Sequence, residues 1–363
     1  MFELSDLPLR ADLVGRQPYG APQLDVPVSL NVNENTHQIP EPVAIEIISR
    51  VAEAVLKVNR YPDREFTSLR EALAHYVGHG VDKAQIWAAN GSNEVLQQIF
   101  QVFGGPGKSV LSFTPSYSMY PLLAQGTGTE FISQQRDERF ELSAETVSKA
   151  IRDAKPNIVI LCSPNNPTGT PIEQSVIAAA YDELQSVSGG ILVVDEAYVE
   201  FAHDQRITAV DLLSTRPNLL VSRTMSKAFA FAGARVGYLV ASPAVCDALR
   251  LVRLPYHLSS FTQAAAEAAL AHSVALLANV DAIREQRDRI VVELTAMGLD
   301  VYRSDANFVL FGGLTDPEHT WQRLLDQGVL VRNVGIPGTL RVTAGTQAET
   351  TAFLTALQQA LGD

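Results

Sequence analysis

Residues 218–237 read Asn-Leu-Leu-Val-Ser-Arg-Thr-Met-Ser-Lys-Ala-Phe-Ala-Phe-Ala-Gly-Ala-Arg-Val-Gly. The apolar start of this stretch predicts a strand, and a turn rich in hydroxyl groups leads to Lys227. A lysine is costly to bury beside a strand, and its pKa falls readily when it is desolvated. Held near Thr224, Ser226 and Arg235, it resembles an amine that forms a Schiff base beside an anion site. Taken alone, a lysine after a strand is more commonly an exposed surface residue, so the rest of the chain has to decide between the two interpretations.

Length and composition indicate a globular protein with a large core. The 363 residues are 46% hydrophobic and 19% charged, which suits two domains, or one domain with a lobe. A formal net charge of −12 argues against nucleic acid as a main partner, because that role needs a basic face. We find no signal-peptide pattern and no apolar run of about 18 residues, so we expect a cytoplasmic protein without a membrane partner. The two cysteines and the scattered histidines show no metal-ligand spacing, so no metal site is expected.

Strand patterns alternate with helical patterns along most of the chain. Residues 1–40 hold several prolines and little periodicity, so we expect an extended arm that lies on another surface, such as a second subunit. We expect a large domain over 59–261 and a small α+β domain over 41–58 and 262–363. Residues 262–297 form one long, alanine-rich helical stretch in this prediction. Because several expected strands are apolar throughout, the large domain is predicted to be an α/β sandwich around a parallel sheet.

Four polar motifs lie where ligands collect in open α/β sheets, at or near the carboxyl ends of strands. They are Gly91-Ser-Asn-Glu94, Ser163-Pro-Asn-Asn-Pro-Thr-Gly169, Asp195-Glu-Ala-Tyr198 and the stretch from Thr224 to Arg235. Ser92 is expected to be the N-cap of a helix whose free N–H groups suit a phosphate. Asp195 is either a helix cap or the buried partner of a cation. Together the motifs supply what pyridoxal phosphate needs: a lysine for its aldehyde, an acid for its ring nitrogen, donors for its ring oxygen and a phosphate site.

The chain resembles the fold-type I pyridoxal-phosphate aminotransferases over nearly its whole length. The resemblance lies in Asn166-Pro-Thr-Gly169, Asp195-x-Ala-Tyr198 and Ser226-Lys-x(7)-Arg235-x-Gly237, which occur in the family's order. It implies a large domain with a mostly parallel seven-stranded sheet in an α/β/α sandwich, and a small α+β domain. Within the family, the chain is most similar to the histidinol-phosphate aminotransferases. The stretches that carry this similarity are 17–19, 30–35, 59–63, 223–229 and 329–333.

The resemblance implies a role for each cofactor-binding residue. Lys227 would be the Schiff-base lysine and the base of the proton transfer, and Asp195 would pair with the pyridinium nitrogen. Asn166 and Tyr198 would bond the ring oxygen. The other implied contacts are Tyr117 on the ring face, Tyr61 from the neighbouring subunit, and Ser92, Asn93, Thr224, Ser226 and Arg235 at the phosphate. The contact from Tyr61 implies a homodimer with shared active sites.

The resemblance also implies a substrate site and a reaction. Arg341 would clamp an α-carboxylate, because a planar guanidinium binds a carboxylate bidentately, and Arg332 would bind the substrate phosphate. The other substrate contacts expected are Asn93, Asn166 and the tyrosines Tyr19, Tyr120 and Tyr256 around the imidazole. The implied reaction is the reversible amino transfer between L-glutamate and imidazole-acetol phosphate that gives L-histidinol phosphate in histidine biosynthesis.

Three other functions stay open at this point. An aromatic amino-acid aminotransferase would use the same scaffold, but a phosphate-free substrate would leave Arg332 without an obvious partner. A phosphothreonine-type decarboxylase would use the same lysine and break a different bond. A non-catalytic binding protein with this fold predicts the loss of Lys227 or Asp195, and both residues are present.

Overall fold

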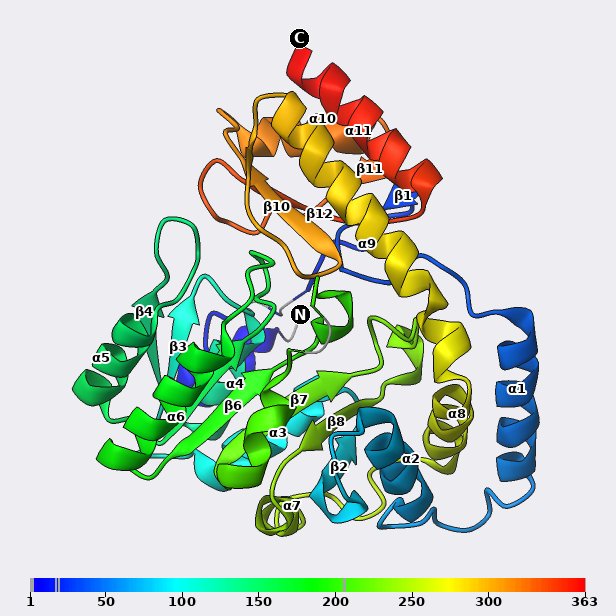
Figure 1. Cartoon of the computed structure of the whole chain (residues 1–363), viewed down its shortest axis with the longest axis vertical. Helices are drawn as coiled ribbons and strands as arrows, with labels where there is room; N and C mark the ends of the chain where they lie inside the picture. Colours follow the sequence, from blue (N-terminus) through cyan, green and yellow to red (C-terminus); the bar gives the residue numbers. More distant parts are fainter. Residues whose placement is uncertain (1–2, 17, 19, 205–206, 363) are drawn as a thin grey trace.

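A seven-stranded sheet forms the centre of the larger part of the molecule (Figure 1). The computed structural model describes residues 3–16, 18, 20–204 and 207–362, and the strand order in this sheet is β2-β8-β7-β6-β5-β3-β4. The strands are β2 (Ile86–Ala89), β3 (Ser109–Thr114), β4 (Glu130–Gln135), β5 (Ile158–Cys162), β6 (Ile191–Asp195), β7 (Leu219–Thr224) and β8 (Gly237–Val240). Within it β8 runs antiparallel to both of its neighbours, and the other pairings are parallel. The predicted mostly parallel seven-stranded sheet is therefore confirmed.

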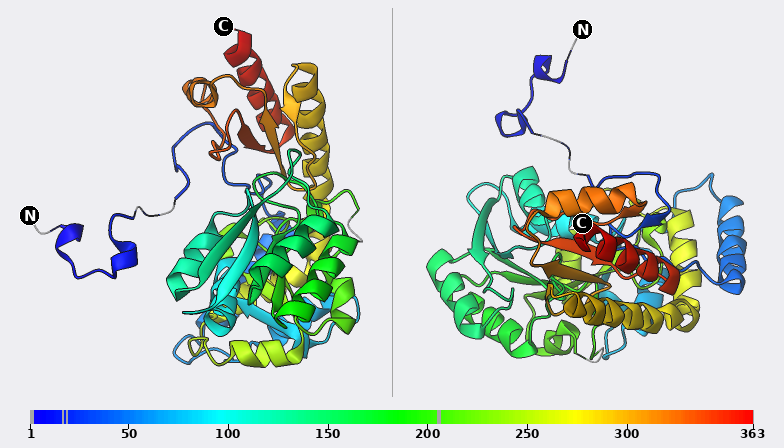
Figure 2. Two further views of the ribbon diagram at one scale, coloured as in Figure 1. Left: turned by 90° about the vertical axis from the view of Figure 1, so that its left-hand side faces the viewer. Right: turned by 90° about the horizontal axis from the view of Figure 1, so that it is seen from above.

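Helices cover both faces of this sheet (Figure 2). They are α2 (Thr67–Val77), α3 (Ser92–Phe103), α4 (Met119–Thr127), α5 (Ala144–Ala154), α6 (Gln174–Val187) and α7 (Pro243–Leu249). Helices α5 and α6 pack against each other, and α3 packs against α4 and α7. Strands β5 and β6 are buried along their whole length, which explains why their sequences are apolar without alternation.

The C-terminal part of the chain builds a second, smaller unit next to the large sheet (Figure 1). Its antiparallel sheet has the order β12-β10-β9, with β9 (Asp300–Val301), β10 (Phe308–Gly312) and β12 (Leu340–Thr343). Its helices are α9 (Ser273–Ala296), α10 (Pro317–Asp326) and α11 (Gln347–Gly362). Strand β1 (Val28–Ser29) pairs in parallel with β11 (Val329–Leu330), so the end of the N-terminal arm joins this unit.

The long helix predicted over 262–297 is wrong, because this stretch forms two helices. Helix α8 (Ser260–Ala271) and α9 meet at His272 with an angle of 72° between them. The break is at His272, whose φ of −112° lies outside the helical range. Composition does not reveal it, since neither glycine nor proline marks the position. Among the described residues no single helix is long and apolar enough to cross a membrane, and α8 with α9 passes that test only as a bent pair.

Helix α8 packs against α2 and against α1 (Glu41–Val55), whereas α9 packs against α11 and β10. Helix α1 thus lies beside α8, away from the small antiparallel sheet (Figure 1). The division into an arm, a large domain over 59–261 and a small domain that includes 41–58 remains a prediction.

Candidate active site

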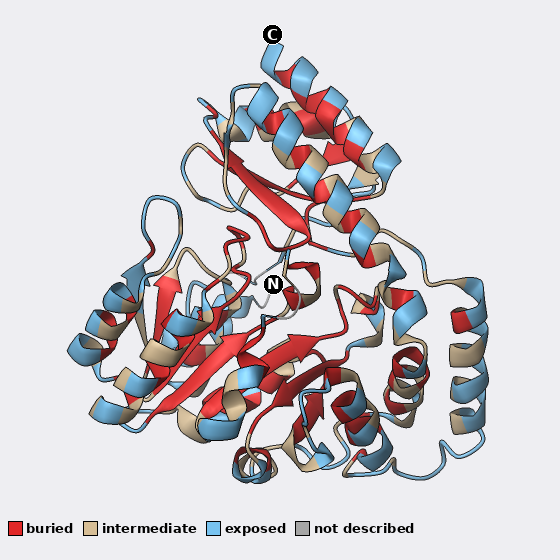
Figure 3. Ribbon diagram, in the orientation of Figure 1, coloured by how far each residue is buried: buried red, intermediate tan, exposed pale blue. Residues whose placement is uncertain are grey.

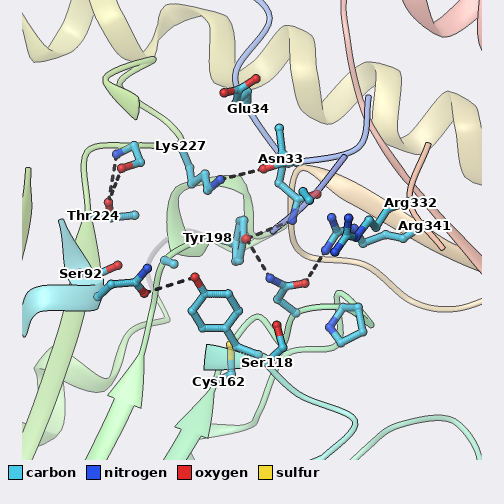
Figure 4. Close-up of a pocket in the computed structure, with 18 of the residues that line it drawn as sticks. Asn33, Glu34, Ser92, Ser118, Cys162, Tyr198, Thr224, Lys227, Arg332 and Arg341 are labelled. Carbon is cyan, nitrogen blue, oxygen red and sulfur yellow. Dashed lines mark hydrogen bonds between the residues drawn. The ribbon is translucent and has the colours of Figure 1, made fainter. Parts of the chain in front are cut away.

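A cavity of about 440 Å³ lies at the carboxyl ends of β5, β6 and β7 (Figure 4). The segment 31–34 and residues 332–334 and 341 of the C-terminal unit complete its lining. It gathers twelve of the residues singled out from the sequence: Ser92, Asn93, Tyr117, Asn166, Asp195, Tyr198, Thr224, Ser226, Lys227, Arg235, Arg332 and Arg341. This is the position at which open α/β sheets bind their ligands.

Lys227 follows the end of β7 and lines the cavity, half-buried. Its Nζ donates a hydrogen bond to the backbone oxygen of Val32, 3.1 Å away. Burial lowers the pKa of this lysine to about 8, and the positive charges of Arg341 and Arg235 act in the same direction. At pH 8 Lys227 is therefore neutral in about half of the molecules. A neutral amine can attack an aldehyde or accept a proton.

Asp195 is the last residue of β6 and is buried against the cavity. Its Oδ2 accepts a hydrogen bond of 2.8 Å from the hydroxyl of Tyr120, and its Oδ1 has no partner among the described residues. Burial raises the pKa of this carboxyl to about 6, against the opposing effect of the Tyr120 bond. A buried carboxylate is stabilised by a cationic N–H, so the unpaired oxygen suits a protonated ring nitrogen.

Arg341, Asn166 and Tyr198 form a hydrogen-bonded chain along the cavity (Figure 4). Arg341 Nη1 donates to Asn166 Oδ1 at 2.6 Å, and Asn166 Nδ2 donates to Tyr198 Oη at 3.4 Å. Arg341 Nη2 also donates to the backbone oxygen of Asn31 at 2.7 Å. Burial raises the pKa of Tyr198, so its hydroxyl keeps its proton near neutral pH.

The N-terminus of α3 lines the cavity, but Ser92 is not its cap as predicted. The N-cap is Gly91, whose φ of 87° favours glycine, and a Cβ there would lie 2.5 Å from Nη2 of Arg235. Ser92 is therefore the first helical residue. Across from it, Thr224 donates a hydrogen bond of 2.9 Å to Ser226. Free helix N–H groups, hydroxyls and a guanidinium together suit a phosphate.

The structure brings one of the expected tyrosines of the substrate site near the cavity, but not into it. Tyr120 was expected to line the substrate site, and this needs correction: it is fully buried in α4 and donates to Asp195. Its position follows from the helix face that packs on the sheet, where a buried hydroxyl needs a partner. Tyr256 stacks on Tyr61 with ring centroids 4.5 Å apart, and neither residue lines the cavity. Tyr19 lies outside the described residues. Tyr117, expected on the cofactor ring, does line the cavity.

None of the residues Asn31–Glu34 was predicted to belong to the site, although the stretch 30–35 carries part of the family resemblance. The segment has no periodicity that would indicate a function, yet it lines the cavity between the two units. It gives Lys227 an acceptor and contacts Tyr198 through Asn33. The alternating asparagines of Asn31-Val-Asn-Glu-Asn35 were the available signal, because amides in an irregular segment need hydrogen-bond partners.

The sequence matches the family described as Aminotransferase class I and II over residues 26–357. It is 61% identical over 358 residues to the histidinol-phosphate aminotransferase of Paenarthrobacter aurescens, covering 99% of this chain and 96% of that protein. It is 55% identical over 365 residues to the enzyme of the same name from Frankia casuarinae, covering 99% and 92%. The histidinol-phosphate aminotransferase of Sinorhizobium meliloti, solved in complex with pyridoxal-5'-phosphate, has a TM-score of 0.83 at 26% identity, covering 93% and 91%.

Proposed function

Because the chain belongs to the class I and II aminotransferase family, we propose that it transfers an amino group between L-glutamate and imidazole-acetol phosphate, giving L-histidinol phosphate. The observation that carries the proposal is the joint presence of Lys227, the unpaired oxygen of Asp195 and the N-terminus of α3 in one cavity. The relatives at 61% and 55% identity carry the name of this activity.

The residues of the cavity fit pyridoxal phosphate as the cofactor. Its phosphate would lie at the N-terminus of α3 with Thr224, Ser226 and Arg235, and its ring nitrogen would meet Asp195. Tyr117 would lie on the ring face, and Asn166 and Tyr198 would bond the ring oxygen. When bound, the cofactor supplies a conjugated ring that draws electron density from the substrate Cα.

Lys227 is the residue we assign to proton transfer. Its lowered pKa leaves a neutral amine near pH 8, which would accept the proton from the substrate Cα and donate it again later in the reaction. The hydrogen bond to Val32 holds the amine within the cavity. Asp195, ionised above pH 6, would hold the ring nitrogen of a bound cofactor in its protonated form.

We assign two guanidinium groups of the cavity, those of Arg332 and Arg341, to the binding of anionic substrates. The backbone N–H of each of Arg332 and Arg341 donates a hydrogen bond of 2.9 Å to the backbone oxygen of the other. Both residues line the cavity. Glutamate has two carboxylates, one for each arginine. In L-histidinol phosphate a phosphate ester is attached where an amino acid has its carboxyl carbon, so its dianion would lie between both arginines. An aromatic amino acid needs one arginine only.

We further propose that the protein is a cytoplasmic homodimer with shared active sites. Much of α1 is exposed (Figure 3), and its exposed residues include Ile45 and Ile48, at 60% and 67% exposure. Leu251 and Leu254 are also exposed. Apolar surface of this kind marks an interface. Tyr61 is 80% exposed and therefore accessible to a second subunit, which supports its proposed contact with the partner's cofactor.

A panel of single half-reactions tests the substrate. The purified protein loaded with pyridoxal phosphate is mixed in turn with L-histidinol phosphate, L-phenylalanine and L-phosphothreonine, and loss of the cofactor's visible absorbance is followed. We expect the fastest loss with histidinol phosphate. Equal or faster loss with phenylalanine would favour the aromatic aminotransferase, and release of carbon dioxide from phosphothreonine would favour the decarboxylase. If the protein binds no chromophore at all, the proposed pyridoxal-phosphate-dependent activity is refuted.

A further inference from the structure

Asn33 connects the cavity to the C-terminal unit. It is 2% exposed, and its Nδ2 donates a hydrogen bond of 3.1 Å to the hydroxyl oxygen of Tyr198. Its backbone N–H donates to Thr343 Oγ1 at 3.1 Å, and its backbone oxygen accepts from Asn307 Nδ2 at 3.2 Å. Thr343 and Asn307 belong to the C-terminal unit, at β12 and next to β10, whereas Tyr198 follows β6 of the large sheet.

The contacts with Thr343 fix which way the Asn33 amide faces. Thr343 Oγ1 accepts the backbone N–H of Asn33, so its own proton is available for Asn33 Oδ1, 3.2 Å away. With Oδ1 facing Thr343, the NH₂ group faces Tyr198. Asn33 has a φ of 58°, a left-handed conformation that asparagine tolerates better than most residues.

Tyr198 consequently accepts two hydrogen bonds, one from Asn33 and one from Asn166. A phenol has a single proton, and two accepted bonds occupy the oxygen's lone pairs. The proton is then left to be donated toward the cavity that Tyr198 lines. Bonds donated to an oxygen also make its own hydroxyl a stronger donor.

We propose that Asn33 is a positioning residue, which fixes the hydroxyl of Tyr198 as a donor to the ring oxygen of the cofactor and ties that donor to the C-terminal unit. The inference rests on the proposed cofactor and deepens the proposed function. Asn33 does not touch the reacting atoms and acts through Tyr198.

A donor at the ring oxygen withdraws electron density from the nitrogen that joins the cofactor to Lys227, because the two atoms are conjugated. A weaker donor leaves that nitrogen more basic. The pH at which the bound cofactor changes its visible absorbance should therefore rise when Asn33 is removed. The charged and titratable groups that face Tyr198 and Lys227 are Arg341, Arg235, Glu34, Tyr117 and Cys162, and all stay in place in the variants below.

The experiment is a spectrophotometric pH titration of the cofactor-loaded protein. Asn33→Gly removes the amide and keeps the backbone unstrained, because glycine adopts a positive φ freely. We expect its midpoint to rise by roughly 0.5–1 pH unit, a threefold to tenfold change in proton affinity, as for the loss of one hydrogen bond. Asn35→Ala is the matched control: its amide donates to the backbone oxygen of Ala228 and does not contact Tyr198, so its midpoint should match that of the unmodified protein.

A double variant separates positioning from a general structural effect. In a Tyr198→Phe background, Asn33→Gly should cause no further rise in the titration midpoint, because the hydroxyl through which Asn33 acts is absent. An unchanged midpoint in Asn33→Gly, or a full additional rise in the double variant, would overturn the role of Asn33 while leaving the proposed function intact. A protein that binds no chromophore at all would instead overturn the proposed function.

Discussion

Replacing Asp195 with asparagine is expected to stabilise the cofactor-free protein and to weaken its binding of pyridoxal phosphate. Asparagine has nearly the same shape and can still accept the hydroxyl of Tyr120 through its carbonyl oxygen. It removes the charge whose burial raises the pKa of Asp195 to about 6. The same change removes the anionic partner of the cofactor's ring nitrogen.

The size of the stability effect follows from the pKa of Asp195. In the folded chain the pKa lies about two units above its ordinary value of 3.8, and one unit corresponds to about 1.4 kcal/mol. Because the folded pKa is raised, the folded state binds the proton more tightly and loses stability as the pH rises from 3.8 to 6. Ionisation of the buried Asp195 carboxyl lowers the free energy of unfolding by about 3 kcal/mol above pH 6, and by roughly half of that at pH 5.

The assay is urea unfolding of the cofactor-free Asp195→Asn variant and of the unmodified protein, at one fixed protein concentration and at pH 5 and 7.5. We expect the variant to be more stable by about 2–3 kcal/mol at pH 7.5 and by about half of that at pH 5. Its affinity for pyridoxal phosphate should fall at least tenfold, as for a lost charge-assisted hydrogen bond. A stability gain that does not change with pH, or unchanged cofactor affinity, would refute the reasoning about Asp195.

Three further predictions concern other residues of the site. When pyridoxal phosphate and borohydride are added to the cofactor-free protein, the rate at which Lys227 is labelled should increase with pH, with a midpoint near pH 8. A midpoint near pH 10.5 would contradict the lowering of the Lys227 pKa by burial. Arg332→Ala should lower kcat/KM for histidinol phosphate roughly tenfold to hundredfold and spare phenylalanine, with Arg332→Lys intermediate; equal losses in steady-state assays would count against a phosphate contact. Mixed dimers of Tyr61→Ala and Lys227→Ala chains should regain activity that neither variant has alone, because one of their two sites contains both native residues. Failure to regain it would argue against shared sites.

The parts of the site that the sequence predicted are those that follow long buried strands. The apolar runs of β5, β6 and β7 indicate parallel strands, and the motifs that follow them hold Asn166, Asp195 and Lys227. Parallel strands bring their carboxyl ends to one edge, so side chains far apart in the sequence meet without further information. All three residues line the cavity.

The contacts that sequence patterns did not predict come from irregular or short segments. Strand β1 and strand β9 have two residues each, too few to show alternation. The direction of a tyrosine within α4 depends on how the helix packs, which is why Tyr120 contacts Asp195 and not the cavity. The same holds for Asn33, which contacts Tyr198 on one side and, on the other, Thr343, 310 residues later in the sequence.

The hydrogen bonds of the segment 31–33 also constrain when the site can form during synthesis. Asn33 with Thr343, and Asn31 with Arg341, are pairs separated by 310 residues. At about 5–20 residues per second, a ribosome makes the second partner roughly 15–60 s after the first. The large sheet can fold in the later part of that time, once β8 has been made, but the segment still has no β12 to contact and nothing orients the Asn33 amide toward Tyr198. A nascent chain therefore cannot assemble the complete cavity before Arg341 and Thr343 have been made, and tight cofactor binding should begin only after that point.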